Sequence, residues 1–162
     1  MHNFQEFYHG KKVLVTGADG FMGSHLTERL VSYGAHVIAF VRWSALITPH
    51  NIQLKNIAHL KDKVKIISGN IASYDIIETI KREKPEIIFH LAAEAYVNKS
   101  FDQPREVIDA NVDGTLNVLH SCLDENMHPA SFIKRIVVTS SSEVYGTYNE
   151  KIKESFTMNP SS

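Results

Sequence analysis

The sequence predicts an α/β fold, a doubly wound parallel sheet with helices on both faces. Short runs of β-branched residues alternate along the chain with amphipathic stretches, which is typical of repeated strand–helix–strand units. A glycine-rich turn joins the first of these runs to the first amphipathic stretch. Of the 162 residues, 43% are hydrophobic, enough for one core of ordinary domain size. The formal net charge of −1 gives no general attraction to nucleic acid or to an anionic membrane.

Five strands and the helices between them follow from this pattern. The first helix is indicated by Met22, Leu26 and Leu30, which recur at helical spacing. The expected strands cover residues 12–16, 36–41, 64–67, 87–91 and 135–139. The expected helices cover residues 21–32, 74–84 and 104–125, with another around 52–60 inside an irregular connection. The positions of the longest helix expected to face the sheet are Val107, Ala110, Asn111, Gly114, Val118 and Cys122.

The turn after the first strand is a candidate phosphate-binding loop. Gly17 permits the tight turn, Gly20 lets the backbone approach a phosphate, and Gly23 lets the helix pack on the strand. The N-terminus of the following helix offers free N–H groups to an anion. The residues expected to contact a dinucleotide here are Gly17, Ala18, Asp19, Gly20, Phe21, Met22 and Gly23. The alternative interpretation is a glycine turn without a ligand.

With this loop in place, the predicted sheet has the strand order 3-2-1-4-5 of a Rossmann-type fold. The end of the second strand then decides which dinucleotide is bound. Arg42 stands where an acidic residue would select NAD, and it can pair with the 2′-phosphate of NADP, with Ser44 adding a hydrogen bond. NADP is therefore favoured over NAD, although Arg42 as a solvated surface residue would leave NAD possible. Asn70, followed by Ile71, is a candidate for the adenine amino group, or a plain turn asparagine.

Four motifs, in order, carry a family resemblance. After the loop Thr16-Gly17-x-x-Gly20-x-x-Gly23 come His90-Leu91-Ala92-Ala93, Asn111-Val112-Asp113-Gly114-Thr115 and Ser140-Ser141-Ser142-Glu143-Val144-Tyr145-Gly146. Together they resemble the extended short-chain dehydrogenase/reductase family, in particular its nucleotide-sugar 4,6-dehydratases. The Val41-Arg42 ending is similar to that of GDP-mannose 4,6-dehydratases, which use NADP.

The resemblance implies roles for residues at the ends of the fourth and fifth strands. Leu91, Ala92 and Ala93 would lie beside the nicotinamide half of the cofactor, and Thr139 is a further expected cofactor-binding residue. Asn111 would hold the backbone of the site, more as a structural residue than as a direct ligand. We expect His90 to be buried and hydrogen-bonded rather than catalytic, and no histidine pair has convincing metal-ligand spacing.

The resemblance also implies the chemistry of the segment after the fifth strand. A 4,6-dehydratase oxidises C4, removes water across C5 and C6, and returns hydride to C6. Ser141 would hydrogen-bond the C4 oxygen, Ser142 would relay a proton as the acid, and Glu143 would take the C5 proton. The same motifs leave open a nucleotide-sugar 4-epimerase or a UDP-glucuronate decarboxylase. From another class, a non-catalytic dinucleotide-binding module also remains open.

The tail after the fifth strand departs from the family pattern. The family's catalytic Tyr-x-x-x-Lys follows soon after the Ser-Glu segment, and we expect this motif to be absent from the chain, since neither Tyr145 nor Tyr148 has a lysine four positions later. We expect a tail at residues 1–10, an NAD(P)-binding domain at 11–146, and a polar tail at 147–162. The sixth strand and the C-terminal substrate domain have no candidate, so this chain would be inactive by itself. The parent enzyme would be cytoplasmic and take a nucleotide-sugar substrate, and a homodimer is one assembly that the resemblance leaves open.

Overall fold

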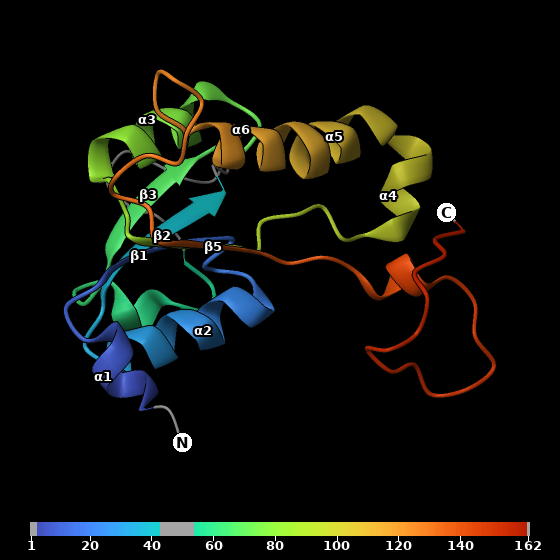
Figure 1. Ribbon diagram of the computed structural model, residues 1–162, viewed down its shortest axis with the longest axis horizontal. Helices are drawn as coiled ribbons and strands as arrows, with labels where there is room; N and C mark the ends of the chain where they lie inside the picture. The colour runs from blue at the N-terminus through green and yellow to red at the C-terminus, as the bar shows by residue number, and fades with distance from the viewer. Residues whose placement is uncertain (1–2, 43–53, 162) are drawn as a thin grey trace.

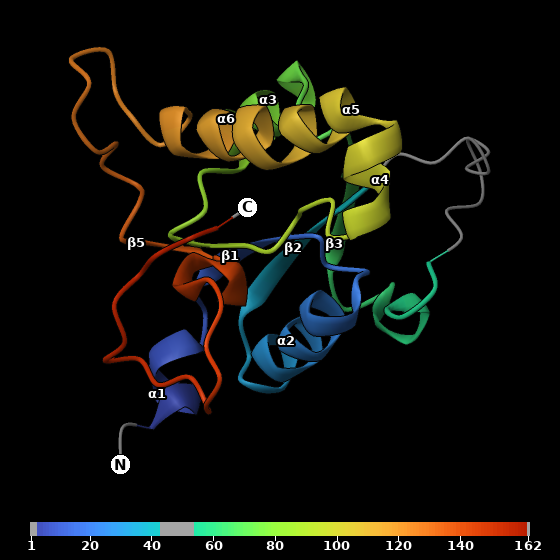
Figure 2. The ribbon, with the colours of Figure 1, turned by 90° about the vertical axis from the view of Figure 1, so that its right-hand side faces the viewer.

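The computed structural model describes residues 3–42 and 54–161 and contains one five-stranded sheet (Figures 1 and 2). The strands are β1 (Lys12–Thr16), β2 (His36–Arg42), β3 (Lys65–Gly69), β4 (Ile87–His90) and β5 (Arg135–Val138). All four pairings are parallel, and the order β3-β2-β1-β4-β5 confirms the prediction.

Helices cover both faces of this sheet, as predicted. One face packs against α2 (Phe21–Ser32) and the short 3-10 helix η1 (Ala58–Leu60), through Val13, Val15 and Leu30. The other face packs against α3 (Tyr74–Glu83) and α6 (Gly114–His120), through residues such as Ile76, Ile80 and Val118. Figure 1 shows these layers, with α3 and α6 above the sheet and α2 below it. The β-branched runs of β1, β2 and β4 are largely buried, as a parallel sheet between two helical layers requires, whereas Val137 and Val138 of the edge strand β5 are exposed.

The long helix expected over residues 104–125 is shorter and interrupted. It begins as α5 (Pro104–Ile108), passes through a π-helical turn, η2 (Asp109–Asp113), and ends as α6 at His120. The helix stops because residues 121–130 fold into a turn, in which the Asp124 carboxylate accepts N–H groups from Asn126 and His128. The sheet-facing prediction holds for Gly114, Val118 and Cys122, which are buried.

Two helices were not expected from the sequence. α1 (Phe4–Tyr8) lies in the segment expected to be a tail. The side-chain oxygen of Asn3 accepts its Glu6 N–H, and the Tyr8 ring stacks on Tyr33 at 6.2 Å. α4 (Val97–Asp102) lies between β4 and α5. The third strand is also displaced from the expected 64–67 to Lys65–Gly69. Of the helix expected around 52–60, residues 52 and 53 lie outside the described residues, and the described part contains η1.

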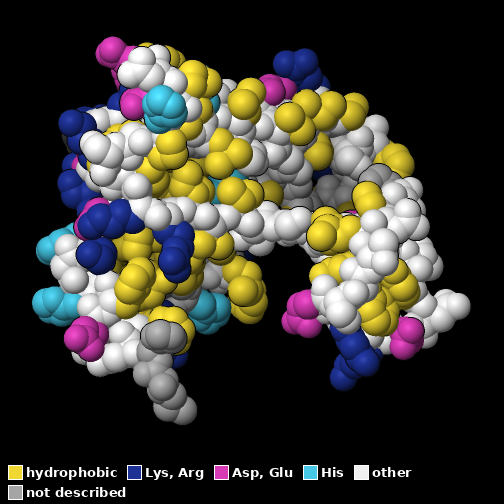
Figure 3. Space-filling view, in the orientation of Figure 1, with side chains coloured by type: hydrophobic (Ala, Val, Ile, Leu, Met, Phe, Trp, Pro, Cys, Tyr) yellow, Lys and Arg dark blue, Asp and Glu magenta, His cyan; other side chains and the backbone are white. Residues whose placement is uncertain are grey.

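The segment after β5 leads away from the sheet into the short 3-10 helix η3 (Ser142–Tyr145) and then into an irregular tail. The tail folds back, since Asn159 N–H donates to the Val144 carbonyl at 2.9 Å. Figure 3 shows a hollow between this segment and the body of the molecule. Within residues 3–42 and 54–161, no helix combines the length and apolar composition that crossing a bilayer requires.

Candidate cofactor-binding site

The glycine loop between β1 and α2 is closed by contacts that only glycine allows. Gly17 has a φ of +68°, and a Cβ there would lie 3.0 Å from the backbone of Ala92. A Cβ on Gly23 would lie 2.1 Å from the Gly17 carbonyl oxygen. Gly20 is the N-cap residue of α2, and no side chain caps this helix. The first turn of α2 therefore offers its N–H groups and the positive end of its dipole to an anion.

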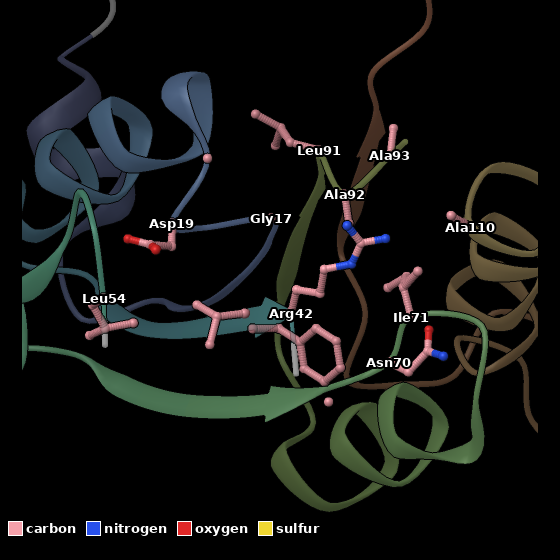
Figure 4. A pocket seen from close by; sticks show the side chains of 14 residues that line it. Gly17, Asp19, Arg42, Leu54, Asn70, Ile71, Leu91, Ala92, Ala93 and Ala110 are labelled. Carbon is pink, nitrogen blue, oxygen red and sulfur yellow. The ribbon is translucent and has the colours of Figure 1, made fainter. Parts of the chain in front are cut away.

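A cavity of about 410 Å³ opens beside this loop, at the carboxyl ends of the strands (Figure 4). Several predicted cofactor residues line it, from the loop and from the segments after β2, β3 and β4: Gly17, Asp19, Gly20, Arg42, Asn70, Ile71, Leu91, Ala92 and Ala93. In open α/β sheets, ligands bind at the carboxyl edge beside the first strand, because the connections from the strands on its two sides run in opposite directions along the sheet.

Other predicted cofactor residues do not line this cavity. Gly23 and the buried Ala18 support the loop from within it, whereas Phe21 and Met22 are exposed at the start of α2. Thr139 follows β5 and donates its N–H to the His90 carbonyl at 3.1 Å. Ser44 lies outside the described residues.

Five lining residues were missed in the sequence: Phe40, Val41, Leu54, Gly69 and Ala110. Phe40 and Val41 directly precede Arg42, and Gly69 directly precedes Asn70. Their position next to a predicted site residue at a strand end could have identified these three residues from the sequence. Leu54 and Ala110 reach the cavity through tertiary packing, for which the local sequence has no signal.

Two predicted cofactor residues use their side chains to hold the protein itself. The Asp19 carboxylate accepts N–H groups from Lys55, Asn56 and Ile57 at 3.0, 2.7 and 3.1 Å, so it fixes the chain that leads into η1. Asn70 is at the same time a turn residue, because its side-chain oxygen accepts the Ala72 N–H at 3.0 Å. Both residues line the cavity, and the hydrogen bonds of their side chains are structural.

Arg42 reaches across the cavity from the end of β2 toward Ala92 (Figure 4). Its Nη2 lies 3.3 Å from Oε2 of Glu94, in the loop after β4. The same carboxylate oxygen accepts a hydrogen bond from Lys99 Nζ at 2.9 Å. The hydrogen bond from Lys99, and then that from Arg42, holds the pKa of the Glu94 carboxyl below its usual value. Glu94 was not singled out from the sequence as a site residue.

His90 is buried and hydrogen-bonded, as expected. The Thr16 hydroxyl oxygen accepts N–H groups from Leu91 and Ala92, so its proton is directed to Nδ1 of His90, 2.8 Å away. The neutral ring then carries its proton on Nε2 and donates to the Thr115 hydroxyl at 3.1 Å. Burial lowers the pKa of His90, which agrees with a neutral ring. The ring thus fixes the end of β4, with no free nitrogen for catalysis.

Asn111 holds the backbone of the loop after β4. Its Oδ1 accepts the Glu94 N–H at 2.7 Å, and its Nδ2 donates to the Glu94 carbonyl at 3.1 Å. It lies in the π-helical turn η2, and a Cβ at the following Gly114 would lie 2.8 Å from Ile71. The close approach of this helix therefore places Asn111 against the loop. This geometry matches the backbone-holding role that the resemblance implies.

The candidate catalytic residues Ser141, Ser142 and Glu143 lie apart from the cavity. They are exposed, and Ser141 caps η3 by accepting the Glu143 N–H at 3.2 Å. In Figure 2, η3 lies beyond the end of β5 and well apart from α4, and the loop after β4 passes between the two helices. Within the described residues, no three His, Cys, Asp or Glu side chains are placed to share a metal ion.

One Tyr-x-x-x-Lys spacing does occur in the chain, at Tyr8 and Lys12, and corrects the expectation that the motif is absent. Tyr8 ends α1 and packs against Tyr33 and Phe89, while Lys12 Nζ donates to the Glu83 carbonyl at 2.9 Å. Lys12 begins β1, at the edge of the sheet opposite to the cavity. These two residues therefore serve packing rather than the site.

The strand order, the glycine loop and the cavity define a Rossmann-type, nucleotide-binding domain. A family model described as GDP-mannose 4,6-dehydratase matches residues 14–162. The chain therefore belongs to the GDP-mannose 4,6-dehydratase family, among the nucleotide-sugar dehydratases and epimerases of the short-chain dehydrogenases/reductases.

This chain is similar both to relatives named as dehydratases and to relatives named as epimerases. CDP-glucose 4,6-dehydratase of Salmonella typhimurium is 35% identical over 142 residues, which are 87% of this chain and 37% of that protein. UDP-glucose 4-epimerase of Mycolicibacterium smegmatis is 34% identical over 84% of this chain and 41% of that protein. The structure of UDP-glucose 4-epimerase from Brucella ovis in complex with NAD superposes with a TM-score of 0.69 at 27% identity, over 93% of this chain and 42% of the other. The chain thus spans less than half the length of these relatives.

Proposed function

We propose that the chain is the NADP-binding part of a nucleotide-sugar 4,6-dehydratase. The observation that carries the proposal is the cavity between the glycine loop and Arg42, at the edge of the sheet where ligands bind. The family supports a nucleotide-sugar substrate, and the dehydratase relative supports the reaction.

The residues present fit a dinucleotide. Gly17 and Gly23 let the loop close tightly, because a Cβ at either would clash with backbone atoms, and Gly17 and Gly20 line the cavity without side chains. The uncapped N-terminus of α2 suits a pyrophosphate, and the small side chains of Ala92 and Ala93 leave room for a flat ring. When bound, the nicotinamide supplies the acceptor and donor of hydride.

Arg42 supports NADP over NAD. Its guanidinium is largely exposed at the rim of the cavity, and a guanidinium pairs with a phosphate through two parallel hydrogen bonds. Arg42→Asp is expected to weaken NADP binding about tenfold or more and to affect NAD much less, because only NADP carries the 2′-phosphate. Calorimetric titration with both cofactors measures the two affinities. Equal losses for NADP and NAD would refute this role.

In the proposed reaction, the residues that act on the sugar belong to the segment after β5. Glu143 would take the C5 proton, Ser142 would relay a proton to the leaving C6 hydroxyl, and Ser141 would hydrogen-bond the C4 oxygen. Product analysis with the full-length protein and nucleotide hexoses tests this reaction. A 4-keto-6-deoxy sugar is the expected product. A C4 epimer would instead indicate a 4-epimerase reaction, as in the name of the M. smegmatis relative, UDP-glucose 4-epimerase. The possible homodimer stays a prediction for analytical ultracentrifugation.

A further inference from the structure

The ion pair between Arg42 and Glu94 spans the cavity. Arg42 ends β2 and Glu94 follows β4, and β1 lies between these two strands in the sheet. The pair therefore crosses above the end of β1, where the glycine loop begins. Figure 4 shows the Arg42 side chain extended in this direction. A dinucleotide on the glycine loop meets an arginine that is already bound to a carboxylate.

Glu94 is held in place independently of this ion pair. Both of its backbone polar groups are bonded to the side chain of Asn111, at 2.7 and 3.1 Å. Its own side chain is only 12% exposed. The carboxylate is thus a fixed acceptor beside the cavity rather than a freely moving surface charge.

Two cations share this carboxylate unequally. Lys99 lies 2.9 Å from Oε2 and is itself held by Glu106 at 2.8 Å, whereas Arg42 lies 3.3 Å away. The Arg42 side chain is 71% exposed, against 23% for Lys99. Arg42 is therefore the partner that leaves more readily. When it leaves, Lys99 still pairs with Glu94, so that no largely buried charge is left without a partner.

We propose that Glu94 is a positioning residue that sets the preference between NADP and NAD, because it competes with the 2′-phosphate of NADP for Arg42. The inference rests on the proposed role of Arg42 as the group that binds this phosphate. NAD lacks the 2′-phosphate and does not need Arg42 to be released. Glu94 therefore lowers the affinity for NADP more than the affinity for NAD, and Lys99 weakens this effect by sharing the carboxylate.

The test is calorimetric titration of the purified protein and its variants with NADP and with NAD at one ionic strength. Glu94→Gln keeps the backbone bonds to Asn111 and removes the charge. Since an exposed ion pair shifts an equilibrium by about two- to fivefold, we expect NADP to bind about fivefold more tightly and NAD to change less than twofold. Lys99→Gln leaves Glu94 with Arg42 alone, so the ratio of NADP to NAD affinity should fall by about twofold.

Two control variants separate competition from general effects. Glu86→Gln makes the same change in charge at a carboxylate that pairs with Lys11 and Lys134, just before β4 at the opposite edge of the sheet, and should leave the ratio unchanged. Glu94→Asp retains the charge and should keep the ratio nearer to that of the unmodified protein than Glu94→Gln does. In an Arg42→Gln background, Glu94→Gln should no longer change the ratio.

The possible failures are distinguishable. If Arg42→Gln weakens NADP selectively but Glu94→Gln leaves the ratio unchanged, the competition is refuted and the role of Arg42 stands. If Glu94→Gln raises the ratio equally with and without Arg42, Glu94 acts directly on the cofactor and the inference is also wrong. If Arg42→Gln weakens both cofactors equally, the proposed NADP preference fails first.

Discussion

Replacing Gly23 by alanine perturbs the contact on which the glycine loop depends most. The new Cβ would lie 2.1 Å from the Gly17 carbonyl oxygen and 2.8 Å from its carbonyl carbon. Both atoms belong to the backbone, so no side chain can rotate out of the way. Since protein interiors are close-packed, α2 must move away from the loop by about 1 Å. Overpacking of this kind costs about 2–3 kcal/mol.

For a domain of this size, a loss of 1 kcal/mol lowers the Tm by about 2–4 °C, so Gly23→Ala should lower it by roughly 5–10 °C. The assay is thermal unfolding followed by circular dichroism, together with calorimetric titration with NADP. Gly20→Ala is the matched control in the same loop, because its Cβ would lie 3.1 Å from the same oxygen and should cost less. A Gly23→Ala protein with an unchanged Tm and unchanged NADP affinity would refute the reasoning.

Three further predictions concern groups outside the cavity lining. Burial raises the pKa of the Cys122 thiol to about 11, so the native protein should react with a disulfide reagent at pH 8 about 100-fold more slowly than the unfolded protein; similar rates would contradict its burial. Hydrogen bonds from Lys65 and Arg82 lower the pKa of Glu83 in the folded state, so its contribution to stability is present above the unfolded pKa of about 4.5 and is lost as the pH falls through the folded value. Urea unfolding should therefore show a difference between the wild type and Glu83→Gln that shrinks below pH 4.5, and a constant difference would argue against the pairing. Thr16→Val should cost about 2 kcal/mol in the same assay, because it leaves the N–H of Ala92 and a nitrogen of His90 without partners; a neutral effect would contradict these hydrogen bonds.

The sheet could be predicted from the sequence because each strand is a short β-branched run next to a clear turn signal. The place of α2 and of the glycine loop followed from these local patterns, and the strand order followed from the Rossmann-type fold that the loop indicates. The end of α6 could not be predicted, because apolar residues continue to Leu123 while the turn depends on hydrogen bonds that Asp124 makes after folding.

Some residues of the candidate site could likewise be predicted from the sequence, and others could not. Glycines and Arg42 were found because their roles depend on residue type and on their position at a strand end. Glu94 was not, since its importance depends on Arg42 and Lys99, which are 52 positions before it and five positions after it in the chain. An ion pair that joins two strand ends has no local sequence pattern.

We expect this chain to bind NADP at the edge of the sheet formed by the glycine loop and Arg42. Calorimetric titration of the purified protein with NADP and with NAD tests it most directly. We predict saturable binding with one site per chain, tighter for NADP than for NAD, and loss of the difference in Arg42→Asp. If neither cofactor binds, this edge of the sheet is not a dinucleotide site.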